Sequence, residues 1–133
     1  SLMPYSPLAA GHLTRPTWKS DSLRCRTDLA AKGKYDDAEA NDMEIVKRVQ
    51  KVADNHHASM AQVALAWLWS KEVASPIVGG TKKKNYDDAV GALDIRLEQE
   101  EVEYLEEPYL PHKIIGAIGV NPPEGTVLLD VKK

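Results

Sequence analysis

A serine-proline turn near the start of the chain combines residue types that can hold a phosphate group. It follows a short apolar run, and its members are Ser6, Pro7, Leu8, Gly11 and Leu13. The Ser6 hydroxyl and the backbone N–H groups of the turn are hydrogen-bond donors, and Gly11 permits close approach of phosphate oxygens. A plain turn from a strand into a loop would have the same spacing. The residues alone leave both interpretations open.

A second stretch repeats the order of apolar run, glycines and helix start. It comprises Pro76, Ile77 and Val78, followed by Gly79, Gly80, Thr81, Lys82, Lys83, Lys84 and Asn85. Three lysines at a helix N-terminus oppose the helix dipole, which favours anions at that end. A bound phosphate would remove this conflict, because N-terminal amides and lysines together form an anion site.

The lysines also have a structural explanation that needs no ligand. Asp87 and Asp88 follow Lys83 and Lys84 by four residues, the spacing of ion pairs on one helix face. Each such pair contributes only about 0.2–0.5 kcal/mol to helix stability. The spacing is compatible with an anion site and with a solvated, self-paired face.

The elements that position these residues alternate between strands and helices. Apolar runs predict short strands at 2–5 and 76–78, with Pro4 placed best at a strand start or edge, and residues 11–40 read as a long polar loop. Apolar residues at helical spacing predict helices at about 42–55, from 60 onward, at about 82–93 and at about 98–107. This order is typical of a parallel α/β fold. A lone strand at 127–129 is also compatible with the sequence.

Two of these helices carry N-terminal capping patterns. Asn41 is followed three residues later by Glu44, and Ser59 is followed by Gln62 at the same spacing. We therefore expect Asn41 and Ser59 to be the N-cap residues of the helices at 42–55 and 60 onward.

Composition restricts the function classes. The chain has 133 residues, whereas a closed (β/α)8 barrel usually needs about 250. A net charge of -3 gives no reason to expect nucleic-acid or membrane binding, and no apolar run approaches the roughly 18 residues of a membrane span. One cysteine, Cys25, excludes an internal disulfide framework and suits a reducing compartment. We expect a cytoplasmic protein.

Isolated histidines and tryptophans are weaker candidates for a site. His56 and His57 have no third metal ligand at useful spacing, so a favourable position at a helix C-terminus explains them better. His12 and His112 are expected in solvated loops, although either one facing a substrate pocket is the alternative. Trp18 belongs to the long loop and is either a loop residue or part of a substrate pocket mouth.

Taken together, the two glycine-containing segments resemble those of the aldo-keto reductases, in the branch of fungal aryl-alcohol dehydrogenases and hemiacetal reductases. The resemblance extends to Ser59–Trp67, to Val90–Leu93 and to Leu105–Tyr109. It implies an α/β fold, the last two β/α units plus extra helices of a (β/α)8 TIM barrel, over residues 1–118. Residues 119–133 would be an extra tail of unknown structure. By this resemblance the chain is a C-terminal portion of such an enzyme.

The resemblance also implies a cofactor, NADP, and a carbonyl substrate. Residues 6–13 would wrap the pyrophosphate, while Gly79, Gly80, Thr81, Lys82, Asn85 and Asp88 would hold the adenosine 2′-phosphate and adenine. Where the family often has an asparagine after the acidic residue, this chain has Ala89. The catalytic Asp, Tyr, Lys and His of the family belong to earlier strands, so no catalytic residue and no metal ligand is assigned here.

Two functions follow from this reading. In one, the chain is the cofactor-binding part of an NADP(H)-dependent reductase of aldehydes or ketones. In the other, it is a truncated, catalytically inactive paralogue that acts as an interaction partner or has no autonomous function. Uncovered strands would then offer edges for self-association.

Overall fold

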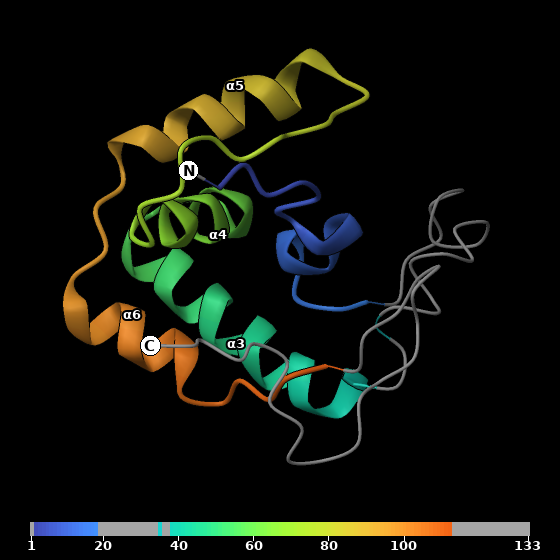
Figure 1. Cartoon of the computed structure of the whole chain (residues 1–133), viewed down its shortest axis with the longest axis vertical. Helices are drawn as coiled ribbons and strands as arrows, with labels where there is room; N and C mark the ends of the chain where they lie inside the picture. The colour runs from blue at the N-terminus through green and yellow to red at the C-terminus, as the bar shows by residue number, and fades with distance from the viewer. Residues whose placement is uncertain (1, 19–34, 36–37, 113–133) are drawn as a thin grey trace, which may run out of the picture.

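The computed structural model describes residues 2–18, 35 and 38–112 and consists of helices linked by extended segments (Figure 1). The elements are η1 (Ala9–Thr14), α3 (Glu39–Asn55), α4 (Met60–Trp69), α5 (Lys83–Gly91), η3 (Ala92–Asp94) and α6 (Gln99–Glu106). Most of the loop predicted at 11–40, including Cys25, lies outside the described residues. So do the tail at 119–133 and the strand predicted at 127–129.

Helix α4 occupies the centre of the structure and contacts α3, α5, η1 and η3 (Figure 1). Its sequence is almost entirely apolar, and Val63 and Leu65 are completely buried although they lie on different sides of the helix. A helix that is hydrophobic all round is stable only when neighbours cover every side. The apolar faces predicted for α3 and α6 supply this cover through Val46, Val49 and Leu105.

The capping prediction is confirmed for α4 and wrong for α3. The Gln62 N–H donates to Ser59 Oγ over 3.1 Å, and the Ser59 N–H donates to Gln62 Oε1 over 3.0 Å, which is a complete capping box. Helix α3 instead begins at Glu39, so Asn41 lies inside it. The Asn41 amide donates to the Pro108 carbonyl over 2.6 Å, a contact that links distant parts of the chain.

The predicted strands at 2–5 and 76–78 are reduced to one parallel bridge between Tyr5 and Ile77, and the described residues contain no longer strand. The Ile77 N–H donates to the Pro4 carbonyl over 2.8 Å, and the Ala74 N–H donates to the Leu2 carbonyl over 2.9 Å. Proline has no N–H, so Pro4 and Pro76 each remove one donor from the ladder. The pairing therefore stops after one bridge, and the α/β prediction holds only for the order of extended segments and helices.

The helices predicted at 82–93 and 98–107 are present with shifted ends. Helix α5 begins at Lys83, because Lys82 has an extended backbone, and the chain tightens into η3 after Gly91. Helix α6 begins at Gln99, and the preceding Glu98 N–H donates to Glu101 Oε2 over 3.0 Å.

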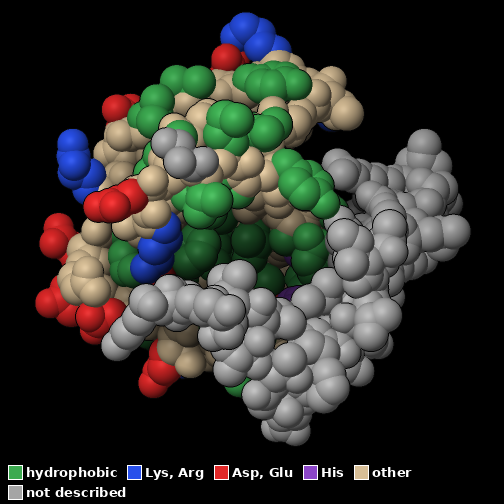
Figure 2. Space-filling view, in the orientation of Figure 1, with side chains coloured by type: hydrophobic (Ala, Val, Ile, Leu, Met, Phe, Trp, Pro, Cys, Tyr) green, Lys and Arg blue, Asp and Glu red, His purple; other side chains and the backbone are tan. Residues whose placement is uncertain are grey.

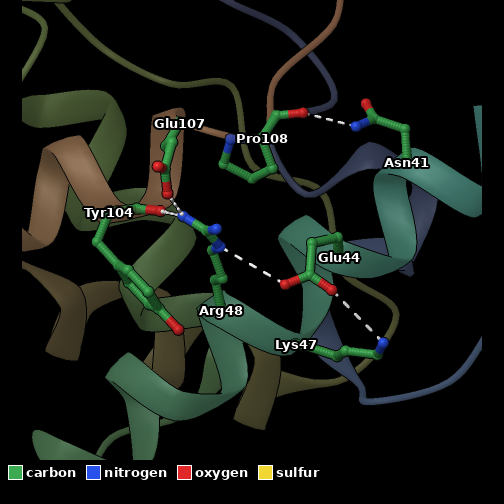
Figure 3. A network of polar contacts seen from close by, with 7 residues as sticks. All are labelled: Asn41, Glu44, Lys47, Arg48, Tyr104, Glu107 and Pro108. Carbon is green, nitrogen blue, oxygen red and sulfur yellow. Dashed lines mark hydrogen bonds and ion pairs between the residues drawn. The ribbon is translucent and has the colours of Figure 1, made fainter.

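Arg48 of α3 holds the C-terminal end of α6 (Figure 3). The Tyr104 carbonyl would ordinarily accept a hydrogen bond from residue 108, but Pro108 has no N–H. Arg48 Nη1 fills this role by donating to the Tyr104 carbonyl over 2.6 Å, and it also donates to Glu107 Oε2 over 2.6 Å. The guanidinium lies 4.5 Å from the centre of the Tyr104 ring. One arginine thus replaces the donor that a proline removes.

We expect Arg48→Met to lower the urea concentration at which the chain unfolds, because the Tyr104 carbonyl then has no donor on α3. Lys47→Met is the matched control, since Lys47 is largely exposed and contacts only Glu44 at 3.5 Å. Circular dichroism during urea titration measures both. Equal midpoints for the two variants would contradict the role of Arg48.

Two further ion pairs join α6 to the rest of the structure. Glu106 accepts a hydrogen bond from the Trp67 indole N–H over 2.7 Å and pairs with the Lys71 ammonium. The hydrogen bond with Lys71 lowers the pKa of Glu106 below its ordinary value of 4.5; burial opposes this shift, while Trp67 and the lysine charge support it.

The second pair joins His56, at the end of α3, to Glu101 over 2.8 Å. Burial alone would raise the pKa of Glu101, but its hydrogen bonds with His56 and with the Glu98 backbone, together with the charge of His56, lower it below 4.5.

Acid should therefore weaken the attachment of α6. A carboxyl whose pKa is lowered by folding stabilises the folded state above its ordinary pKa, and this contribution is lost as the pH falls from about 4.5 through the lowered value. We expect Glu106→Gln to destabilise the chain at about pH 7 and to do so less at about pH 3, because the wild-type carboxyl loses its charge as the pH falls through its lowered pKa. Urea titrations at both values measure this. A difference that is the same at both would show that Glu106 acts through shape rather than charge.

Candidate functional site

The two predicted phosphate-binding segments leave the Tyr5–Ile77 bridge in the same direction. The bridge is parallel, so Ser6 and Val78 lie at the same end of the paired segments. From there one segment enters η1 and the other runs to the start of α5 (Figure 1). Both segments therefore begin side by side at the bridge and then diverge, one toward η1 and the other toward α5.

The first segment forms a tight turn with left-handed backbone. Ser6, Ala9 and Ala10 have φ values of 55°, 49° and 55°, and Gly11 has a φ of 97°. A glycine is suited to such a value, whereas the three other residues adopt it at a steric cost. The Ala9 N–H donates to the Ser6 carbonyl over 3.0 Å, and the Gly11 N–H donates to the Leu8 carbonyl over 2.8 Å.

These hydrogen bonds change the expected chemistry of the turn. The Leu13 N–H also donates to the Leu8 carbonyl, over 3.4 Å, so three of the amides available for a phosphate already have partners inside the turn. Ser6 is exposed, while Pro7 and Leu8 are half-buried. In this conformation the Ser6 hydroxyl is the predicted donor best placed to meet a ligand.

The second segment folds back on the start of α5. The Gly80 N–H donates to the Tyr86 hydroxyl over 3.1 Å, and that hydroxyl donates to the Gly80 carbonyl over 2.8 Å. A Cβ at Gly80 would lie 2.8 Å from the Cβ of Asn85, whereas a Cβ at Gly79 would meet nothing within 4 Å. Gly80 is thus required by packing, and Gly79 faces open space.

Among the described residues, no side chain caps the N-terminus of α5. Its N-cap residue is Lys82, which has donors but no acceptor, so it cannot satisfy the first N–H groups of the helix. Thr81, Lys82 and Asn85 are exposed. Lys83 Nζ pairs with Asp87 Oδ2 over 2.8 Å, which confirms one of the two predicted ion pairs.

Asp88 lies apart from the exposed members of the predicted set. It is half-buried, and its Oδ2 accepts a hydrogen bond from the Ser59 hydroxyl over 2.8 Å. The carboxylate predicted to pair with Lys84 or to contact adenine therefore joins α5 to the N-terminus of α4. No local spacing rule predicts this bond, because Ser59 and Asp88 are 29 residues apart.

An apolar cavity of about 750 Å³ lies between η1, α3, α4 and α6. Aliphatic side chains such as Val49, Val63 and Leu105 form part of its wall, and Pro7 and Leu13 of the first segment also reach it. Figure 2 shows hydrophobic side chains on the floor of a hollow on this face. The turn predicted to bind phosphate thus borders an apolar space on its inner side.

The expectation that His12 and His112 are solvated loop residues is wrong. Both line the cavity, where the His12 ring lies 4.1 Å from the Trp18 ring and 4.8 Å from the Tyr35 ring, centre to centre. His112 Nε2 lies 2.8 Å from Asp42 Oδ1. Trp18 lines the same cavity, which agrees with its predicted place at the mouth of a pocket; that this pocket takes a substrate stays a prediction.

The described residues contain no cluster of three or more His, Cys, Asp or Glu side chains that could hold a metal ion. Within the same part of the chain, no helix has both the length and the apolar character needed to cross a membrane.

Comparison with known proteins gives relatives that are much longer than this chain. A versiconal hemiacetal acetate reductase from Aspergillus parasiticus is 43% identical over 115 residues, which are 86% of this chain and 34% of the relative. A putative aryl-alcohol dehydrogenase from Saccharomyces cerevisiae is 41% identical over 113 residues, 84% of this chain and 32% of the relative. Another from Schizosaccharomyces pombe is 39% identical over 118 residues, 88% of this chain and 33% of the relative.

The chain therefore spans about a third of the length of these curated relatives. The model of the aldo/keto reductase family matches residues 1–109, which include both glycine-containing segments and every helix described above. The two segments, the helices between them and this match together show that the chain belongs to the aldo/keto reductase family.

Proposed function

We propose that this chain is the cofactor-binding part of an NADP(H)-dependent aldo-keto reductase that reduces aldehydes or ketones. The observation that carries the proposal is the N-terminus of α5, where exposed lysines adjoin helix N–H groups that no side chain of the described residues caps. A phosphate group has the charge and the acceptors that such a helix end lacks. Residues 1–118 would form the functional unit, and the tail at 119–133 would lie outside it.

The residues present fit a dinucleotide phosphate at this end. Lys82 places a positive charge at the helix end but cannot accept hydrogen bonds from the helix N–H groups, so these stay available to a phosphate. Gly79 leaves space for the phosphate to approach the backbone closely. Thr81 and Asn85 are exposed and offer hydrogen-bonding groups for the 2′-phosphate and the adenine. Gly80 would hold this geometry indirectly, through its contacts with Tyr86 and Asn85.

The first segment would bind the pyrophosphate. The Ser6 hydroxyl is exposed at the end of the paired segments, and Pro7, Leu8, Gly11 and Leu13 would shape the turn around the ligand. Such a cofactor, when bound, supplies a hydride to the carbonyl carbon of the substrate. No catalytic residue is proposed in this chain, because the family resemblance places the catalytic Asp, Tyr, Lys and His on earlier strands.

The relatives support a carbonyl substrate. The names of these relatives describe a hemiacetal acetate reductase and aryl-alcohol dehydrogenases. From them we extend to this chain the reduction of an aldehyde or ketone of the kind that an aryl-alcohol dehydrogenase-like enzyme takes. The single cysteine adds the proposal of a cytoplasmic location.

A second candidate function is interaction with another chain through the paired extended segments. Leu2, Met3, Tyr5 and Ile77 are 73%, 66%, 71% and 55% exposed, which is unusual for apolar side chains grouped on two neighbouring segments. A catalytically inactive paralogue would use this apolar surface to self-associate. Sedimentation velocity over a range of concentrations distinguishes a monomer from an assembly.

The lysines at the start of α5 provide the test of the proposed function. We expect replacement of Lys82, Lys83 and Lys84 by alanine to weaken NADPH binding by about tenfold and NADH binding much less, because only NADPH carries the 2′-phosphate. Fluorescence titration of the chain with each coenzyme measures both affinities. Lys47→Ala, at an exposed lysine of α3, is the control and should leave both unchanged.

Equal losses for the two coenzymes would show that the lysines do not recognise the 2′-phosphate. Absence of binding by the wild-type chain, at concentrations where a full-length relative binds, would overturn the proposed function.

A further inference from the structure

Helix α5 is fastened to the N-terminus of α4 by one hydroxyl group. Ser59 Oγ donates to Asp88 Oδ2 over 2.8 Å and accepts from the Gln62 N–H over 3.1 Å. A serine hydroxyl has one proton to donate, so this bond uses its entire donor capacity. The cap of α4 and the attachment of α5 therefore depend on the same oxygen atom.

The same face of α5 meets the capping box at a second point. A Cβ added at Gly91 would collide with Gln62 Nε2, so the Gln62 side chain, which also accepts from the Ser59 N–H, would have to move. Gly91 follows Asp88 by three residues, and residues at this spacing share one face of a helix. Two contacts on one face set how far α5 is rotated about its own axis.

That rotation determines where the start of α5 points. The helix has only nine residues, so Asp88 is little more than one turn from Lys83 and Lys84. The other polar contacts at this end of α5 are local. The Tyr86 hydroxyl bonds to the Gly80 backbone in the preceding loop, and Lys83 pairs with Asp87 within α5. Neither contact reaches α4.

We propose that Ser59 is a positioning residue for dinucleotide binding: through Asp88 it fixes the orientation of α5 and thereby of the exposed lysine and asparagine side chains at its N-terminus. The inference rests on the proposed function of that end of α5. It also assigns Asp88 to the attachment of α5 to α4, in addition to the adenine contact expected from the family resemblance.

The experiment combines hydrogen–deuterium exchange of α5 amides with NADPH titration, both on the full chain. Ser59→Ala removes the bond and the cap, whereas Asp88→Ala removes the bond and leaves the cap. Ser59→Thr keeps the hydroxyl, and Asp88→Asn keeps an acceptor oxygen of the same shape. Ser70→Ala is the matched control, because the Ser70 hydroxyl lies at the opposite end of α4 and donates to the Trp67 carbonyl.

We expect Ser59→Ala and Asp88→Ala each to speed exchange in α5 by about tenfold. NADPH affinity should fall by about fivefold in Ser59→Ala. The double variant should exchange no faster in α5 than Ser59→Ala alone, because both changes remove one bond. Ser59→Thr should keep the exchange and the affinity of the wild type, Asp88→Asn should keep the exchange protection, and Ser70→Ala should change neither measurement.

Unchanged exchange in α5 for both alanine variants would overturn the role of Ser59. Faster exchange with an unchanged NADPH affinity would overturn it as well, because α5 would then be loosened without consequence for the ligand. If the wild-type chain bound no NADPH, the proposed function would fail, and the exchange data would still report whether Ser59 holds α5.

Discussion

Burial of α4 on every side is the constraint on which the rest of the structure depends. This helix has no polar face except at its ends, and Val63 and Leu65 are completely inaccessible. It is stable only because α3, α5, η1 and η3 all pack against it. The packing against α4 also positions both candidate phosphate-binding segments, because one segment enters η1, the other leads into α5, and both η1 and α5 contact α4.

The ends of α4 join the packing to the site. At its N-terminus the capping box contributes Ser59 to the attachment of α5, and just beyond its C-terminus Lys71 pairs with Glu106 of α6. Arg48 completes the attachment of α6 by supplying the donor that Pro108 lacks. Hydrogen bonds and ion pairs at helix ends therefore determine how α5 and α6 are oriented, although both helices are held against the core by apolar contacts. A change at one end of α4 is expected to reach α5 without disturbing the core.

Some surfaces of the described structure remain uncovered. Leu2, Tyr5 and Ile77 are exposed around the single parallel bridge, and Val90 of α5 and Leu93 of η3 are 65% and 62% exposed. The family match and the coverage of about a third of each relative place these side chains in a protein family whose members are much longer. The short pairing has a physical explanation, because a pair of parallel segments is only marginally stable by itself.

Local signals in the sequence were sufficient for part of this structure. The Ser59–Gln62 capping box, the helix from residue 60 and the Lys83–Asp87 pair were predicted correctly, because each depends on residues three or four apart on one helix. Asn41 has the same local pattern, yet α3 begins two residues before it. There the contact with Pro108, far along the chain, outweighed the local preference.

The sequence by itself determined the family, the order of the elements and the residue types of both candidate segments, because motifs and helical periodicity are written in neighbouring residues. Only the tertiary structure decided that Asp88 binds Ser59, that Gly11 donates within its own turn and that His112 meets Asp42 beside an apolar cavity. Hydrogen bonds between residues 29 or 70 positions apart have no local spacing rule. They form where helix packing brings a donor within reach of an acceptor, and that packing depends on how all the elements cover α4.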